Sequence, residues 1–350
     1  MVFNKGNLWG DLFSEARGGG GDNTASAMKG TNKLAILIVT GMLAATTVFF
    51  NLYILLMSLQ SKTKKKKKKW APCETIIVAL CVGNGAHQLV CLVWMTMDQI
   101  DRHCLITNAY YTTVLLLLFS LKFTIMWTTA FLTFYYSAKL VTTPNECHTH
   151  LQTAIVKHAA AVVLLIPLAG LLTCMPMMAV FREYHSNATD ALNEDCGMIT
   201  PDTASGKAYD ALYLVAADVL PGLLMVKCCV SISAHLALHL RHMRSSAVGA
   251  AHAPKLGAQM RVIRMTLSLV LVFLCFLVVD LYVNYQIAVE HDNAVGMTFF
   301  ITSFYTTLSA MVLIYGKKTF WKRLSASCLS ELPPCLPTRR EEKRAPAEHK

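Results

Sequence analysis

Residues 262–286 read VIRMTLSLVLVFLCFLVVDLYVNYQ, and this stretch decides the class of fold. It is rich in Leu, Val and Phe, and its only charged residues are Arg264 and Asp280. A helix needs about 20 apolar residues to cross about 30 Å of hydrocarbon, and lipid tolerates no unpaired backbone. Six further stretches meet the same requirement, namely 34–59, 73–95, 108–136, 155–180, 209–238 and 295–315. The sequence therefore predicts an all-α membrane protein, a seven-transmembrane helix bundle.

Lysine and arginine residues outside these helices gather on one side of the predicted bundle. The loops after the first, third and fifth stretches with their flanks, which include Lys157 and Arg264, and the chain after residue 315 hold 23 of them, and the other side holds 7. Because cytoplasmic loops collect Lys and Arg, we expect the N-terminus outside and the C-terminus inside. Asn187 begins an Asn-Ala-Thr tripeptide in a loop that this count places outside, so Asn187 is a predicted glycosylation site.

The composition agrees with one membrane domain. The chain of 350 residues is 54% hydrophobic and 15% charged, with a net charge of +11. The lysine run 64–69 adjoins a predicted span, so the positive charge indicates contact with membrane lipids and no nucleic-acid partner. We expect an extracellular polar tail at 1–33, a seven-transmembrane receptor domain at 34–316 and a cytoplasmic tail at 317–350. This tail starts with a short amphipathic helix.

Four ionisable residues lie within the predicted spans: Lys122, Asp218, Lys227 and Asp280. Lys122 is about 15 residues, or about 22 Å, from the outer end of its helix. A charge at that depth requires a partner or a water-filled cavity, and Asp218 and Asp280 are the candidates for that partner. Lys227 can instead extend its apolar stem toward an interface.

Two interpretations of Lys122, Asp218 and Asp280 stay open. They either line an outward-open ligand pocket or form a closed ion pair that holds the third, fifth and sixth helices together. A transporter or channel would use similar residues for ions, but its usual internal repeats and Gly-Pro breaks are missing from the sequence. His and Cys show neither a catalytic constellation nor metal-ligand spacing, so we expect no enzyme, no metal and no cofactor.

Seven helices with an outside N-terminus suggest a G-protein-coupled receptor, although the best-known rhodopsin-like motifs are missing. The third helix ends FYYSAK at 134–139, without an acidic-Arg-aromatic triplet. The sixth helix has no proline, and the seventh ends VLIYG at 312–316, without Asn-Pro-x-x-Tyr.

The motifs that the sequence does contain resemble those of the type 2 (bitter) taste receptors. WTTAFLTFYYSAK at 127–139 is similar to that family's tryptophan-to-tyrosine-to-lysine signature at matching spacing. Further similarities, over roughly 35–325, are Leu220-Pro221, Ser231, HLRHM at 239–243, Ser268, Ser309, Leu313 and Lys318. The chain departs from the family at Asn84, where an arginine is usual, and at Leu308 and Gly316, where histidine and asparagine are usual. It therefore resembles a divergent member, with the related vomeronasal type 1 receptors as the alternative.

The resemblance implies a plasma-membrane receptor for bitter small molecules that activates a gustducin-like heterotrimeric G protein. The ligand is expected between helices 3, 5, 6 and 7. The expected ligand-binding residues, from the family's pocket positions and the charge argument together, are Leu118, Lys122, Phe123, Met126, Asp218, Phe276, Asp280, Thr298 and Thr302. The inner helix ends hold the residues expected to meet the G protein or lipid headgroups: Tyr136, Lys139, Arg241, Arg244, Lys317 and Lys318.

Two pairs of residues complete these expectations. Many seven-helix receptors join the positions of Cys104 and Cys196 by a disulfide, and two free or differently paired thiols are the alternative. Asn51 matches the polar residue of the family's first helix. With Asn84 it is expected to form a polar contact between the first and second helices.

Overall fold

The computed structural model describes residues 22–64, 71–101, 108–141, 146–180, 204–245, 253–290, 295–317, 320–321 and 323–324. The elements in this part of the chain are helical. In chain order they are α2 (Asp22–Lys64), α3 (Pro72–Ile100), α4 (Asn108–Leu140), α5 (Glu146–Cys174), α6 (Met177–Val180), α7 (Ala204–Leu214), the π-helical turn η2 (Val215–Val219), α8 (Leu220–Ser245), α9 (Ala253–Glu290) and α10 (Val295–Gly316).

Seven of the helical segments are long and apolar enough to cross a membrane, which confirms the predicted bundle. These spans are Leu34–Gln60, Pro72–Ile100, Ala109–Leu140, Lys157–Ala179, Ala204–Leu238, Met260–Gln286 and Gly296–Gly316. The helices run past several of the predicted apolar stretches. Once a helix is nucleated, each added residue gains a backbone hydrogen bond, so helices continue into polar sequence beyond the apolar limit.

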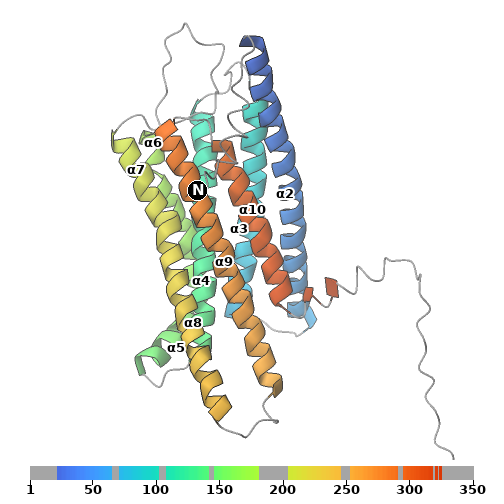
Figure 1. Ribbon diagram of the computed structural model, residues 1–350, viewed down its shortest axis with the longest axis vertical. Coiled ribbons are helices and arrows are strands. Elements are labelled where there is room, and N and C mark those ends of the chain that lie inside the picture. Colours follow the sequence, from blue (N-terminus) through green and yellow to red (C-terminus); the bar gives the residue numbers. More distant parts are fainter. Residues whose placement is uncertain are drawn as a thin grey trace, which may run out of the picture.

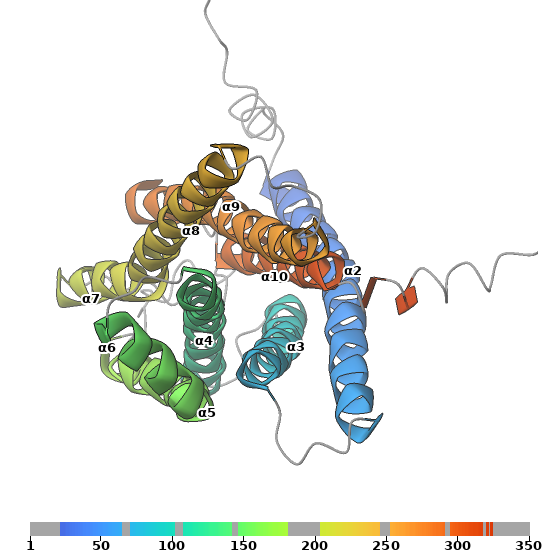
Figure 2. The same ribbon diagram turned by 90° about the horizontal axis from the view of Figure 1, so that it is seen from below.

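The helices run side by side along the long axis of the molecule (Figure 1). We name its two ends by the residues found there: the Ile100 end, where α3 stops, and the Gly316 end, where α10 stops. The fifth span consists of α7, η2 and α8 in one continuous run. Viewed along the bundle, α4 lies inside the ring formed by the other helices (Figure 2).

The central position of α4 shows in its burial. Of its apolar segment 67% is buried, compared with 22% for the first span and 28% for the fourth. The fourth span, mostly α5, leaves leucines such as Leu164 and Leu172 exposed at 73% and 65%. In a membrane protein such leucines face lipid, whereas residues of α4 face other helices. A side chain on α4 can therefore touch partners from most of the bundle.

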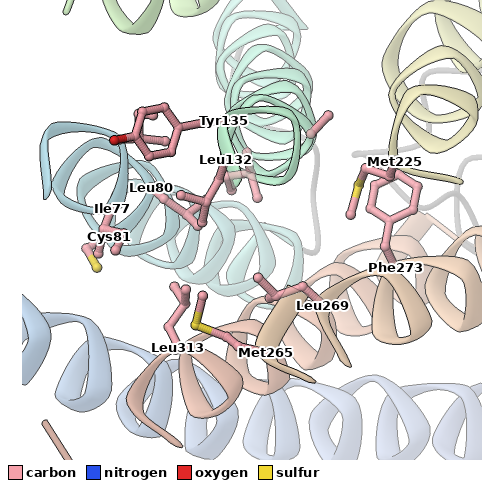
Figure 3. Close-up of a cluster of buried hydrophobic side chains, with 14 of the residues drawn as sticks. Ile77, Leu80, Cys81, Leu132, Tyr135, Met225, Met265, Leu269, Phe273 and Leu313 are labelled. Atoms are coloured by element: carbon pink, nitrogen blue, oxygen red, sulfur yellow. The ribbon is translucent and has the colours of Figure 1, made fainter. Parts of the chain in front are cut away.

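The largest hydrophobic cluster joins α3, α4, α8, α9 and α10 toward the Gly316 end. Figure 3 shows Met225 and Phe273 facing one another, and Leu313 beside Met265. Leu80 and Leu132 lie near one another in the same view, so α3 and α4 contribute the opposite side of the cluster. This packing fixes the inner framework on which the buried polar residues are placed.

Gly316 allows an unusually close approach of α10 to α9. A Cβ atom at this position would overlap the Met265 side chain and would lie 2.7 Å from Met265 Cβ. The methionine tip can move away, but its Cβ moves only with the α9 backbone. The spacing of these two helices at the Gly316 end thus depends on the absence of a side chain at residue 316.

Candidate functional site: a buried lysine between two aspartates

Lys122 on α4 lies between two aspartates from neighbouring helices. Its Nζ donates a hydrogen bond of 2.9 Å to Oδ2 of Asp280 on α9. The same Nζ forms an ion pair of 3.1 Å with Oδ2 of Asp218 in η2. The lysine side chain is 4% exposed and both aspartate side chains are 0% exposed. The expectation that this deep lysine has a partner is confirmed, and both candidate acids pair with it. We call these three residues the charge triad.

The two aspartates are held differently. Asn284, one turn after Asp280, donates a second hydrogen bond of 3.2 Å to Asp280 Oδ2. Asp218 keeps only the ion pair: among the described residues neither of its oxygens accepts a hydrogen bond. Asp280 Oδ1 has no such partner there either. Asp280 and Lys122 therefore form the tighter pair, and Asp218 is the less satisfied acid.

The position of Asp218 depends on a local change of helix register. In η2 the Leu220 N–H bonds to Val215 O, five residues back. The next residue, Pro221, has no N–H, so the matching carbonyl, Ala216 O, loses its helical partner. Trp127 on α4 supplies the missing donor, because its Nε1 lies 3.0 Å from Ala216 O. This side-chain bond satisfies the carbonyl that the π-helical turn and the proline leave open.

Tyr213 attaches the same region to α4 from the Ile100 side. Its hydroxyl donates a hydrogen bond of 2.8 Å to Phe119 O, and its ring packs edge-on against the Phe119 ring at 5.1 Å. With the Trp127 bond, the fifth span is therefore attached to α4 on both sides of Lys122, at Phe119 and at Trp127. Asp218 is directed at Lys122 by backbone geometry that these two contacts fix.

Aromatic rings form the wall of the charge triad. Lys122 Nζ lies 5.6 Å from the centre of the Phe276 ring, close enough for a cation–π interaction. The Phe276 ring packs on Tyr305 of α10 at 4.8 Å, and Phe273 packs on Tyr305 at 6.0 Å. The charges thus lie next to an apolar, electron-rich surface from α9 and α10.

The structure connects some predicted ligand-binding residues to Lys122 directly and places others beside it. Asp218, Phe276 and Asp280 contact its ammonium group. The other predicted residues of α4, all buried, pack into three separate hydrophobic clusters: Leu118, Phe123 and Met126. Thr298 and Thr302 are buried on α10, where Thr302 bonds to the Thr298 carbonyl at 2.8 Å.

Sequence reasoning missed three residues that hold this site: Asn284, Tyr213 and Ala216, whose carbonyl accepts a hydrogen bond from Trp127. The sequence did contain a signal for the contact between Ala216 and Trp127. A proline inside a span leaves a carbonyl without a partner, and a buried tryptophan needs an acceptor. The sequence does not say which proline and which tryptophan meet, because that depends on how two helices are rotated. Asn284 follows Asp280 by one helical turn, a spacing that would have suggested the bond.

A second polar group links the first, second and seventh spans. The predicted contact of Asn51 with Asn84 is confirmed, with Asn84 Nδ2 donating to Asn51 Oδ1 at 3.4 Å. On the same side of α3, Gln88 donates to Thr306 Oγ1 at 2.6 Å and accepts from Ser303 at 3.0 Å. These neutral side chains hold α2, α3 and α10 together without a buried charge.

Side chains at the Gly316 end form their own contacts. Tyr136 Oη lies 2.9 Å from Cys73 Sγ, so α4 and the start of α3 meet there. Lys317 lies 4.0 Å from Glu74 and 4.5 Å from the centre of the Phe320 ring. The expected coupling residues Lys139 and Arg241 are exposed, and Arg244 lies in α8. The Arg244 side chain, Lys318, Asn187, Cys104 and Cys196 lie outside what the structure describes.

Comparison with known proteins gives a family for this architecture. The sequence profile of the family described as Taste receptor protein (TAS2R) matches residues 28–331, which is most of the chain and includes all seven spans. A search of curated proteins finds no match. The family is one of receptors and not of enzymes, and it is the one to which residues 127–139 pointed. The chain belongs to the TAS2R taste receptor family and is a multi-pass G-protein-coupled receptor of the plasma membrane.

Proposed function

We propose that this receptor detects bitter small molecules that bind among α4, the η2 turn with α8, α9 and α10. One observation supports the proposal most: Lys122 of the central helix meets acids from two other helices. A ligand that contacts the charge triad therefore acts on three spans at once. The residues proposed to bind it are the nine expected from the sequence, with Lys122, Asp218 and Asp280 at the centre.

The proposed signal is a change in helix arrangement. Binding shifts a two-state equilibrium only if the ligand prefers one state, so the ligand must favour the arrangement whose Gly316 end opens. Tyr136, Lys139, Arg241, Arg244, Lys317 and Lys318 at or near this end are proposed to meet a gustducin-like heterotrimeric G protein or lipid headgroups. The same proposal places the Gly316 end and the tail 317–350 inside the cell, and residues 1–33 with a glycan on Asn187 outside.

The deciding experiment is a calcium assay in cells that express the chain with a promiscuous G protein. A panel of bitter compounds should contain members that evoke a dose-dependent signal, absent from cells with the G protein alone. The receptor carrying both Tyr136→Ala and Lys139→Ala serves as the coupling-deficient control, with surface density measured for each. A receptor that reaches the surface but responds to no compound would contradict the proposal.

A further inference from the structure

The charge triad carries more negative than positive charge. It contains one lysine and two aspartates, and all three are buried away from water. An unbalanced charge in such surroundings is strongly unfavourable. One further positive charge brought by a ligand would therefore balance the triad.

The carboxylate oxygen atoms without hydrogen bonds indicate which acid would pair with a further cation. Within the described residues, Asp218 Oδ1, Asp218 Oδ2 and Asp280 Oδ1 accept no hydrogen bond. Buried carboxylate oxygens are normally bonded, so a gap of this kind requires an explanation. Since Asp280 Oδ2 already accepts from Lys122 and Asn284, the better counter-ion for an added cation is Asp218.

The wall of the site suits an organic cation. Phe276, Phe273 and Tyr305 form a cluster of tilted and edge-on aromatic rings beside the triad. Aromatic faces attract cations, and they bind alkylated ammonium groups particularly well because these groups are weakly hydrated. A metal ion would need several converging oxygen ligands. The described residues contain no group of three His, Cys, Asp or Glu side chains able to hold one.

An anionic ligand fits this site poorly. Lys122 is the only cation in the triad, and both acids already share it. A bound carboxylate would have to displace one of them and would leave its charge buried without a partner, which is costly. The outer approach also favours cations, because Asp210 lies about two turns before Asp218 in the same span and is partly exposed.

We infer that the receptor selects ligands with a tertiary or quaternary ammonium group on an apolar body, and that Asp218 is the counter-ion of that group. The inference rests on the proposed function and names its ligand class. Lys122, Asp218 and Asp280 are buried in this structure, so a ligand reaches them only when the helices move apart. Such a ligand stabilises the separated arrangement, which is the differential affinity that signalling requires.

The test uses pairs of compounds that differ only in charge. Each pair has one polycyclic body bearing either a trimethylammonium group, whose charge is independent of pH, or its neutral tert-butyl equivalent. Calcium responses are measured on the full-length receptor, normalised to surface density. The wild-type receptor should respond to the ammonium member at least about tenfold more potently than to the neutral one, as expected for a desolvated charge pair.

The variant Asp218→Asn keeps the shape of the side chain and removes its charge. It should abolish the preference for the ammonium member, so that the two members of a pair act with similar potency. The matched control is Asp210→Asn, in the same span but nearer its outer end. This control should keep the preference, because it changes the general negative potential without touching the triad.

The outcomes separate the inference from the proposed function. Equal potency of the two members on the wild-type receptor overturns the inference, whether or not Asp218→Asn reaches the surface. The inference is also overturned if Asp210→Asn reduces the preference for the ammonium member as much as Asp218→Asn does. In both cases the receptor still responds, and the proposed function stands. If both members of every pair and the whole panel of bitter compounds fail on a well-expressed wild-type receptor, the proposed function fails, and the inference fails with it.

Discussion

Trp127 Nε1 donates its hydrogen bond to Ala216 O at 3.0 Å, and Ala216 O is the carbonyl that Pro221 cannot satisfy in the π-helical register. The bond joins the central helix to the span that carries Asp218. The carbonyl that the fifth span leaves without a helical partner is thereby bonded to α4. The position of one charge in the proposed binding site depends on it.

Removing the indole donor should destabilise the receptor. Trp127→Phe keeps an aromatic ring but removes the donor to the half-buried Ala216 O, at a cost of about 1 kcal/mol. We expect a lower unfolding temperature of the detergent-solubilised protein and lower surface density. Trp94→Phe is the control, because Trp94 is a buried tryptophan whose Nε1 has no hydrogen-bond partner among the described residues. Equal losses in the two variants would show that ring volume matters and the bond does not.

Single changes in the Lys122–Asp280 pair distinguish a closed structural pair from a ligand pocket. Breaking a buried pair strands the other charge, at roughly 3–5 kcal/mol. If the pair is structural, Lys122→Met loses surface expression because it strands both Asp218 and Asp280, and adding Asp218→Asn and Asp280→Asn to it restores expression. If the pair lines a pocket, as we propose, the single variants reach the surface and shift dose–response curves differently for charged and neutral agonists.

The measurement is agonist potency and flow-cytometric surface density for Lys122→Met, Asp280→Asn and the triple variant Lys122→Met, Asp218→Asn, Asp280→Asn. Rescue of expression by the triple change, with unaltered ligand responses, would remove Lys122 and Asp280 from the binding site.

Adding one methyl group at residue 316 should raise signalling without ligand. Gly316→Ala places a Cβ against Met265 and pushes α9 away from α10 at the Gly316 end. Because the proposed active arrangement opens this end, the variant should show higher basal activity in a second-messenger assay. Gly296→Ala, in the same helix, is the control, since nothing lies within 4 Å of an added Cβ there. Unchanged basal activity in well-expressed Gly316→Ala would show that this spacing does not control activation.

The end of α4 that carries Tyr136 and Lys139, at the Gly316 end of the bundle, should be needed for coupling. Replacing Tyr136 and Lys139 together by Ala should impair G-protein activation while surface expression stays near normal. Tyr136→Phe keeps the ring and removes only the hydroxyl group that contacts Cys73 at 2.9 Å. This variant separates the hydroxyl contact from the ring. Full agonist-stimulated signalling in the double variant would limit Tyr136 and Lys139 to a structural role.

Antibody access tests the proposed orientation. An epitope at residue 20 should be labelled on intact cells, and one at residue 345 only after permeabilisation, because the basic loops are expected inside. Asn187→Gln should remove a glycan-sized mass shift on an immunoblot. The reverse labelling pattern would overturn the orientation, and an identical mass in both forms would show that Asn187 carries no glycan.

The sequence by itself determined the seven spans and the presence of a charge cluster. Span length follows from the thickness of the hydrocarbon, and a deep Lys122 requires compensation wherever its helix is placed. Both constraints come from the composition of a single stretch of sequence and from the membrane around it. They can be read along the chain without knowing which helices touch.

The tertiary structure alone decided the rest. It showed that Lys122 meets Asp218 and Asp280 together, that Asn284 strengthens only one of these acids, and that Trp127 closes the gap left by Pro221. It also brought Gly316 against Met265. These contacts depend on the rotation and spacing of helices far apart in the sequence, which many packed side chains fix jointly. No single stretch of sequence contains that information, because each contact requires two helices to be placed correctly at once.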